Sequence, residues 1–328
     1  MVTARPPAPV RPASNRVRLA SRPPRLRHRV KRDNLAGPIM SALALLGIIA
    51  FVGVPFVVAV VLSLYNIHIN QPQPPKFWGV TQYARLFADS LTSGVFLRSL
   101  LNNFVFAAVV IPVQTGLALV FAVLLNRKLR GVGFFRALFF MPVVFPLALV
   151  TVIWRLILDR SPDGLLNASV HLVTGGLVPA HDWLGSSATA LASVIMLSVW
   201  QGVGFQMVIL LAALQDIPRE RYEAAAVDGA GGWQQFIHIT VPGIRNTLIF
   251  VVLYTTILAF RVYDQVYILI HSTDANQQAI QTILYQATSS VFDENDLGRA
   301  SAISVVLFGI VVVITLVQRY LLRQGDES

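Results

Sequence analysis

The stretch RYEAAAVDGAGGW, residues 221–233, gathers two carboxylates, four alanines and three glycines between two long apolar runs. Glu223 can accept charge-assisted hydrogen bonds from an arginine of a partner, the alanines present almost no bulk, and Gly229 lets the backbone turn sharply. Side chains of these types suit a surface to which another protein docks closely. The same pattern fits an interfacial hairpin that packs against its own bundle, and the residues alone leave both readings open.

A second group of polar residues lies inside an apolar run, where polar groups are costly and are therefore functional candidates. Arg261 and Asp264 are three positions apart, and on a continuous helix they can pair on one face. Aromatic residues beside hydrogen-bonding groups suit sugars, whose rings have apolar faces and hydroxyl edges. The alternative is a structural ion pair within an ordinary aromatic belt. The candidates for a solute path are Tyr254, Phe260, Arg261, Tyr263 and Asp264, with Gln201, Gln206, Gln114 and Asn103 as weaker ones because single amides often join helices.

The elements that position these residues are expected to be membrane-spanning helices. Of the 328 residues, 55% are hydrophobic and 13% are charged, and the mean hydropathy is +0.64. A transmembrane helix needs about 20 largely apolar residues. The sequence therefore predicts an all-α integral membrane protein with six transmembrane helices, at 38–65, 100–125, 137–158, 188–214, 246–270 and 300–318.

Residues 1–37 form a basic, proline-containing segment, which we expect to be a disordered cytoplasmic tail; the whole chain has a net charge of +10. Such a run can bind nucleic acid, but beside a membrane span anionic lipid headgroups are the favoured partner. The first apolar run is too long for a signal peptide's h-region, so we expect a retained helix.

Charge in the connections sets the expected orientation. Arginines and a lysine crowd residues 126–136, whereas residues 271–297 contain acidic residues. Positive charge marks cytoplasmic loops, so both termini, including residues 323–328, are predicted to be cytoplasmic. The segment 215–245 falls on the same side.

Several chemistries are excluded or disfavoured. The chain has no cysteine, which removes disulfides and thiolate catalysis. It contains no G-x-x-x-x-G-K-[ST] phosphate loop, so it is not expected to hydrolyse ATP or to bind a cofactor. The histidines of the outer loops have no ligand spacing, so no metal site is expected; they are His68, His171, His181 and His271.

Local signals within 215–245 predict a short helix, a turn and a second short helix. Pro218 suits a first helical turn, and Glu220 and Glu223 lie near its positive end. After the glycines, apolar residues recur at helical spacing from Trp233 until Pro242.

This segment resembles the EAA loop of binding-protein-dependent ABC importer permeases. The pattern is E-A-A, three residues, G, nine residues, I, one residue, L-P, and only the Leu is replaced, by Val241. Other stretches agree in order, among them FWGVTQYARLF, DGLLN, VWQGVGFQMVILLAALQDIP and DLGRASAISVVL. The resemblance covers roughly residues 38–322 and is to the carbohydrate-uptake group of maltose and glycerol-3-phosphate permeases, the MalF/UgpA type.

The resemblance implies a MetI-like type I importer permease in a bacterial cytoplasmic (inner) membrane. It implies a non-catalytic subunit that translocates a di- or oligosaccharide delivered by an extracytoplasmic solute-binding protein. The implied partners are a second permease subunit, in a heterodimer, and two ATPase subunits, which bind ATP and Mg. The coupling residues it implies are Glu223, Ala224, Ala225, Asp228, Gly229, Ala230, Trp233, Ile239 and Pro242.

Two other functions stay open. Within the family, the solute can be glycerol 3-phosphate or a glycerophosphodiester, because an arginine serves a phosphate as well as a hydroxyl. Outside it, six helices with an intramembrane Arg261/Asp264 pair would suffice for a stand-alone secondary transporter. The stretch ILIHSTDANQQAIQT also departs from the T-x-G-G-P-like turn common after the fifth helix of the group.

Overall fold

The computed structural model describes residues 41–70, 74–89, 93–127, 131–272 and 276–323. The predicted tail and most of the C-terminal segment lie outside this part. The elements are, in chain order, η1 (Ile49–Gly53), α2 (Val54–Leu62), β1 (Tyr65–Asn66), β2 (Lys76–Phe77), α3 (Thr81–Ala88), α4 (Ser93–Leu125), α5 (Val132–Val144), α6 (Leu147–Ile157), α7 (Leu165–Thr174), α8 (Ala190–Gln215), α9 (Arg219–Val227), α10 (Gly232–Gln235), η2 (Phe236–Thr240), α11 (Val241–Gly243), α12 (Arg245–Phe260), α13 (Asp264–Ser272), α14 (Gln277–Ile280), α15 (Ile283–Phe292) and α16 (Leu297–Arg323).

The chain divides into two units, residues 1–55 and 56–328. The described part of the first unit is helical and carries mostly exposed apolar side chains. In the described part of the second unit, β1 and β2 pair antiparallel, with Tyr65 opposite Phe77.

Five helical stretches in the described part are long and apolar enough to cross a membrane, and a bent pair of helices makes a sixth. They correspond to the predicted six, with shifted ends. α4 begins at Ser93, before the predicted residue 100, and α16 extends from Leu297 to Arg323, beyond the predicted 300–318 at both ends.

The prediction of one continuous third helix over 137–158 is wrong. α5 and α6 are separate helices that meet at 99°. Pro146 explains the break, because proline disfavours helical backbone in the residue before it. Phe145 is accordingly extended, with φ −77° and ψ 143°.

The predicted fifth helix is also interrupted. α12 ends at Phe260 and α13 begins at Asp264. Side chains donate hydrogen bonds to backbone carbonyls at the break. Asn103 Nδ2 donates to Ala259 O (3.3 Å), and Thr282 Oγ1 donates to Val262 O (2.8 Å). Interruptions of membrane helices persist only where such groups are satisfied again.

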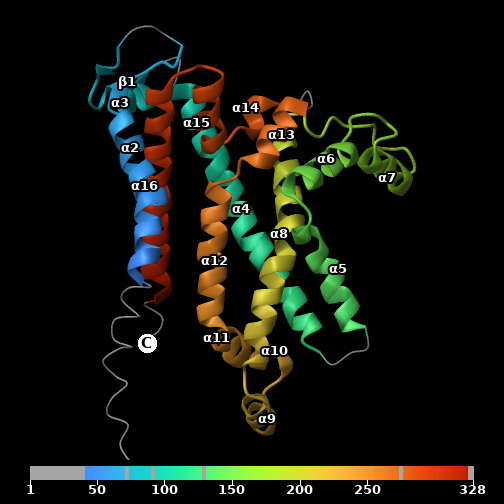
Figure 1. Ribbon diagram of the computed structural model, residues 1–328. Coiled ribbons are helices and arrows are strands. Elements are labelled where there is room, and N and C mark those ends of the chain that lie inside the picture. Colours follow the sequence, from blue (N-terminus) through green and yellow to red (C-terminus); the bar gives the residue numbers. More distant parts are fainter. Residues whose placement is uncertain (1–40, 71–73, 90–92, 128–130, 273–275, 324–328) are drawn as a thin grey trace, which may run out of the picture. The chain divides into compact units, whose positions relative to one another are not determined.

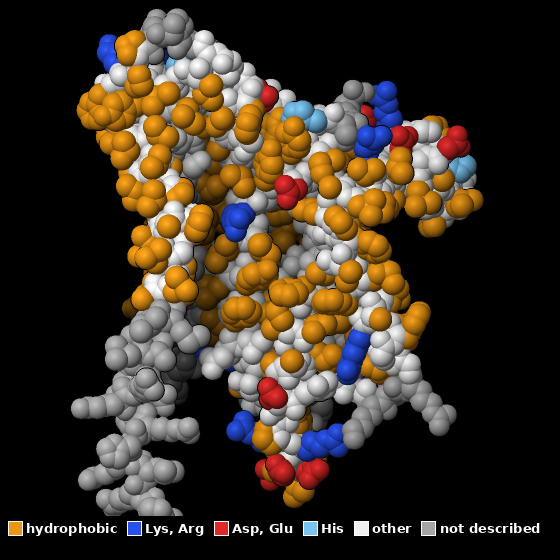
Figure 2. Space-filling model, viewed as in Figure 1, with side chains coloured by type: hydrophobic (Ala, Val, Ile, Leu, Met, Phe, Trp, Pro, Cys, Tyr) orange, Lys and Arg blue, Asp and Glu red, His pale blue; other side chains and the backbone are white. Residues whose placement is uncertain are grey.

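The short segments α9–α11 lie at one end of the helical bundle, and α14 and α15 lie at the other (Figure 1). We call these the α9 end and the α15 end. Between them, the visible face is largely apolar, with charged side chains concentrated toward the ends (Figure 2). This distribution is the one that a membrane-spanning bundle requires.

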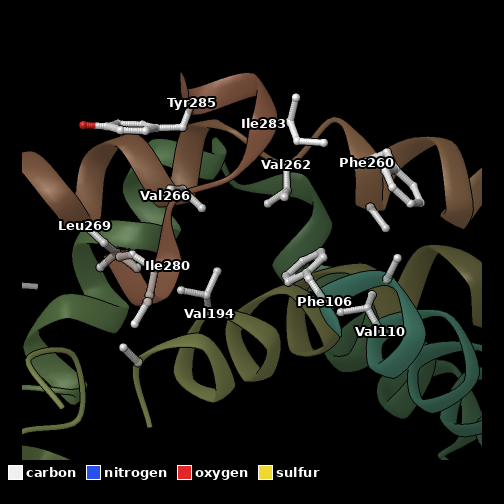
Figure 3. Packing of buried hydrophobic residues seen from close by; sticks show 14 of the residues in the cluster. Phe106, Val110, Val194, Phe260, Val262, Val266, Leu269, Ile280, Ile283 and Tyr285 are labelled. Atoms are coloured by element: carbon white, nitrogen blue, oxygen red, sulfur yellow. The ribbon is translucent and has the colours of Figure 1, made fainter. Parts of the chain in front are cut away.

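Two buried apolar clusters hold the bundle. The larger joins α4, α8, α12–α15 and α16, with Phe106 and Val194 facing the side of the core that holds Phe260, Val266 and Ile283 (Figure 3). The smaller lies toward the α9 end and includes Met207, Leu210 and Ile244. α8 also lies very close to α5: a Cβ on Gly204 would be 2.0 Å from the Phe139 carbonyl oxygen.

Candidate functional site

The turn that ends α9 is built by glycine in a left-handed conformation. Gly229 has φ +81°. The Ala230 amide donates to Ala225 O (2.8 Å) and the Gly229 amide donates to Ala226 O (3.1 Å). These two bonds form a Schellman motif, which terminates a helix by satisfying its last carbonyls. The spacing between the alanines and Gly229 therefore sets where α9 ends.

The second half of the loop folds back beside α9. The predicted helix, turn and second helix are confirmed, although the second helix comprises α10, the π-helical η2 and α11. Tyr222 Oη lies 3.0 Å from Thr240 Oγ1, and Gln235 Nε2 donates to Ala230 O (3.0 Å). Pro218 lies immediately before α9, as its N-cap.

A hollow of about 340 Å³ lies between the two halves of this loop. Its lining includes Ala225, Asp228, Gly229, Ala230 and Ile239. These are five of the predicted coupling residues, so the fold brings them to one concave surface. Small side chains leave the hollow open, and Asp228 supplies a carboxylate at its wall.

The other four predicted coupling residues do not line the hollow. Glu223, Ala224 and Pro242 are exposed. Trp233 is 72% exposed, and its ring stacks on that of Phe236 with 5.6 Å between the ring centroids. Val227, which the sequence did not single out, is 88% exposed at the end of α9. Apolar exposure at a loop that also presents carboxylates is typical of a protein-binding surface.

A second concave site of about 320 Å³ lies where the fifth span is interrupted. Its lining includes Gln114 of α4, Gln201 of α8, and Arg261, Tyr263 and Asp264 at the break. Five predicted solute-path residues therefore meet at this site, which we call the polar cavity. Arg261 and Asp264 are exposed, and Tyr263 is half-buried.

The predicted pairing of Arg261 with Asp264 on one helix face is wrong. The break between α12 and α13 separates them, and neither forms an ion pair with a described residue. Both charged groups are therefore open to the polar cavity instead of neutralising each other by direct contact.

The predicted amides differ in their hydrogen bonding. Gln114 and Gln201 line the polar cavity, whereas Gln206 and Asn103 join the helices around it. Gln114 is buried yet forms no hydrogen bond with a described residue, and its side chain fits against Gly202, where a Cβ would be 2.4 Å from Gln114 Nε2. By contrast, Gln206 Nε2 donates to Thr255 Oγ1 (2.6 Å), which joins α8 to α12. Asn103 Oδ1 accepts from the Ile283 amide (2.8 Å) in addition to its bond to Ala259.

Tyr254 and Phe260 do not line the polar cavity. Phe260 is fully buried in the apolar core against Phe104, and Tyr254 stacks on Phe250. Three polar lining residues were missed: Thr255, and Ser198 and Gln265, which are joined by a 3.0 Å hydrogen bond. Their polarity within apolar runs was the available signal, but nothing in the sequence places them together.

No group of three or more potential metal ligands occurs among the described residues. Near the α15 end, burial raises the pKa of the Tyr285 phenol, and the Asp293 carboxylate raises it further. Tyr285 therefore stays neutral at physiological pH.

Known proteins resemble the chain over most of its length. A family model described as binding-protein-dependent transport system inner membrane component matches residues 84–324. The probable ABC transporter permease protein YurN of Bacillus subtilis is 34% identical, over 89% of this chain and 97% of that protein. The trehalose/maltose transport system permease protein MalF of Thermococcus litoralis is 31% identical, over 87% and 93%.

A solved structure has the same fold. It is a bacterial alginate ABC transporter in complex with alginate pentasaccharide-bound periplasmic protein. The matched chain has a TM-score of 0.75 and 18% sequence identity, covering 91% of this chain and 97% of that chain.

Proposed function

Because the chain belongs to the family of binding-protein-dependent transport system inner membrane components, we propose that it is the permease subunit of an ATP-driven importer for a di- or oligosaccharide. The expected permease family and all-α fold are thereby confirmed. The proposal assigns ATP and Mg to separate ATPase subunits, and delivery of the solute to an extracytoplasmic binding protein. A second permease subunit completes the membrane path.

The observation that carries the proposal is the concave surface of the loop α9–α11. ATP hydrolysis elsewhere can drive this chain only through a contact that transmits motion. The hollow beside Gly229 offers such a contact, because its small side chains admit a partner closely and Asp228 can bind a partner cation. Tyr222 and Thr240 connect the two halves of the loop, so it can move as one lever.

A neutral sugar fits the polar cavity better than a phosphate does. Tyr263 supplies an aromatic surface, while Gln114, Gln201 and Arg261 can bind hydroxyls. Asp264 can also accept hydroxyl hydrogen bonds, but its carboxylate repels a phosphate in the same cavity. The trehalose/maltose relative supports the same choice.

The proposed localisation is the bacterial inner membrane, with the α9 end and both termini in the cytoplasm. A reporter that is active only in the cytoplasm should give signal when fused after Arg323 and none when fused near Asp293. The reverse pattern would place the loop outside the cytoplasm, where it could not contact the ATPase.

The transport proposal is tested with the full-length chain assembled with its partner subunits in vesicles. We expect ATP-dependent uptake of one radiolabelled oligosaccharide from a panel that includes trehalose, maltose and glycerol 3-phosphate. Uptake limited to glycerol 3-phosphate would favour the phosphate alternative. Uptake by this chain without the ATPase, driven by an ion gradient, would favour a secondary transporter.

A further inference from the structure

Three arginines surround a hollow at the α9 end that the proposed transport function does not use. The hollow has a volume of about 430 Å³, and its lining includes Arg127, Arg136 and Arg219. Asp216 and Glu220 are near in sequence, but within the described part of the chain no carboxylate lines it. The concentrated positive charge favours an anionic ligand.

One of these arginines, Arg136, has a hydrogen-bond donor without a partner. Arg136 Nη2 donates to Leu125 O (2.9 Å), at the C-terminal end of α4. Its Nε is buried and has no hydrogen-bond partner. Arg127 and Arg219 form no ion pair with a described residue. A buried guanidinium donor without a partner is costly, so an acceptor at this position would stabilise the site.

The hollow lies where three spanning helices end. Asn126 follows α4, Val132 and Arg136 belong to the first turns of α5, and Gln215 ends α8. The ends of spanning helices lie at the level of lipid headgroups. The available volume is ample for a phosphate group, since a water molecule occupies only about 30 Å³ in the liquid.

An apolar groove runs along the same three helices. It has a volume of about 1150 Å³, and α4 lines it at successive turns with Val109, Val113, Leu117 and Phe121. These residues span roughly 18 Å at 1.5 Å per residue, compared with about 15 Å for half of a bilayer's hydrocarbon core. Phe139 of the groove is three positions from Arg136 of the hollow, so the two sites adjoin on one face of α5.

We propose that the groove and the hollow together bind one anionic phospholipid, with its phosphate at Arg127, Arg136 and Arg219 and an acyl chain along α4. Charge complementarity selects the occupant, because a zwitterionic lipid or an apolar helix leaves the three arginines uncompensated. The bound lipid then connects α5 to Arg219, the first residue of α9, so membrane composition can influence the loop's position. The inference requires a membrane-spanning chain but not a particular solute.

Native mass spectrometry of the full-length chain in neutral detergent tests the site. Phosphatidylglycerol should bind with a stoichiometry of one and phosphatidylcholine much more weakly. In the double variant Arg127→Gln, Arg219→Gln, affinity for phosphatidylglycerol should fall about 25-fold, from about fivefold per arginine near a membrane surface. Both residues are exposed, so the fold should survive, as an unchanged melting temperature would verify.

The matched control is Arg98→Gln, because Arg98 lines the same groove but is separated from Arg136 along its length. It should leave phosphatidylglycerol affinity within about twofold of wild type, less than the effect of one arginine. Equal binding of both lipids, or a loss in the control as large as in the double variant, would overturn the proposal.

A second pair of measurements separates the lipid from other occupants. Val113→Trp, which fills the groove at a half-exposed position, should weaken phosphatidylglycerol binding. Inorganic phosphate should bind far more weakly than the lipid, because it gains nothing from the groove. If inorganic phosphate binds as tightly as the lipid, or if Val113→Trp leaves lipid binding unchanged, the lipid assignment is wrong.

Discussion

The loop α9–α11 and the polar cavity are both concave, yet they are built in opposite ways. The hydrogen bonds that shape the loop join residues of the loop itself, such as Ala230 to Ala225 and Tyr222 to Thr240. The polar cavity depends on bonds that join distant elements, such as Asn103 of α4 to Ile283 of α15. A local motif can therefore be recognised in sequence, whereas the polar cavity exists only once the bundle has formed.

The two regions also differ in what a substitution should damage. The loop projects from the bundle and its candidate residues are mostly exposed, so changes there should spare folding and affect partner binding. The break beside the polar cavity is held by buried bonds, so changes in its support should affect folding first.

The largest effect is expected for Asn103→Leu, which keeps the number and branching of the side-chain heavy atoms. It leaves the Ala259 carbonyl and the Ile283 amide buried without partners. Each such loss costs about 1 to 3 kcal/mol, so destabilisation of about 2 to 6 kcal/mol is expected. The measurement is the melting temperature of the purified chain in detergent.

Gln201→Leu is the control for this variant, because Gln201 lines the polar cavity without a hydrogen bond to a described residue. Its melting temperature should stay close to that of the wild type. If both variants lose equal stability, the bonds of Asn103 do not hold the break.

Glu223→Ala should have the next largest effect, on partner binding and not on folding. A charge-assisted contact is worth about 1.5 to 3 kcal/mol. Less ATPase should therefore co-purify with the variant, while membrane insertion and melting temperature stay unchanged. Glu220→Ala, also exposed on α9, is the matched control. Wild-type attachment of the ATPase to Glu223→Ala would count against the proposed contact.

Gly229→Val should be damaging because of backbone conformation. A β-branched residue at φ +81° is strained by about 1 to 3 kcal/mol, although a Cβ there meets no atom within 4 Å. The turn should shift and coupled uptake in vesicles should fall. Gly231→Val is the control, because Gly231 has φ −69°. Equal uptake by the two variants would show that the turn's geometry is not needed.

Features that depend on local sequence could be predicted, whereas features that depend on contacts between distant elements could not. Gly229 was predicted as a turn because its helix-ending signal is local, and the apolar runs predicted the spans. The break at Phe145 was missed although Pro146 is visible in the sequence. A proline alone does not show where a helix ends, since Pro112 lies within the continuous helix α4. The interruption at Arg261 could not be foreseen, since donors from Asn103 and Thr282 stabilise it across the fold.

The smallest effect concerns the solute and tests whether the polar cavity acts as one site. Asp264→Asn keeps the size of the side chain and removes its charge. A hydrogen bond to a charged acceptor exceeds a neutral one by about 1 kcal/mol, so uptake of a neutral sugar at limiting concentration should fall about fivefold. Asp163→Asn, an exposed carboxylate between α6 and α7, should leave uptake unchanged. The same assay with glycerol 3-phosphate gives the opposite sign under the phosphate alternative, because removing a repulsive carboxylate should then increase uptake. Unchanged uptake of both solutes in Asp264→Asn would mean that Asp264 is structural and that the solute passes elsewhere.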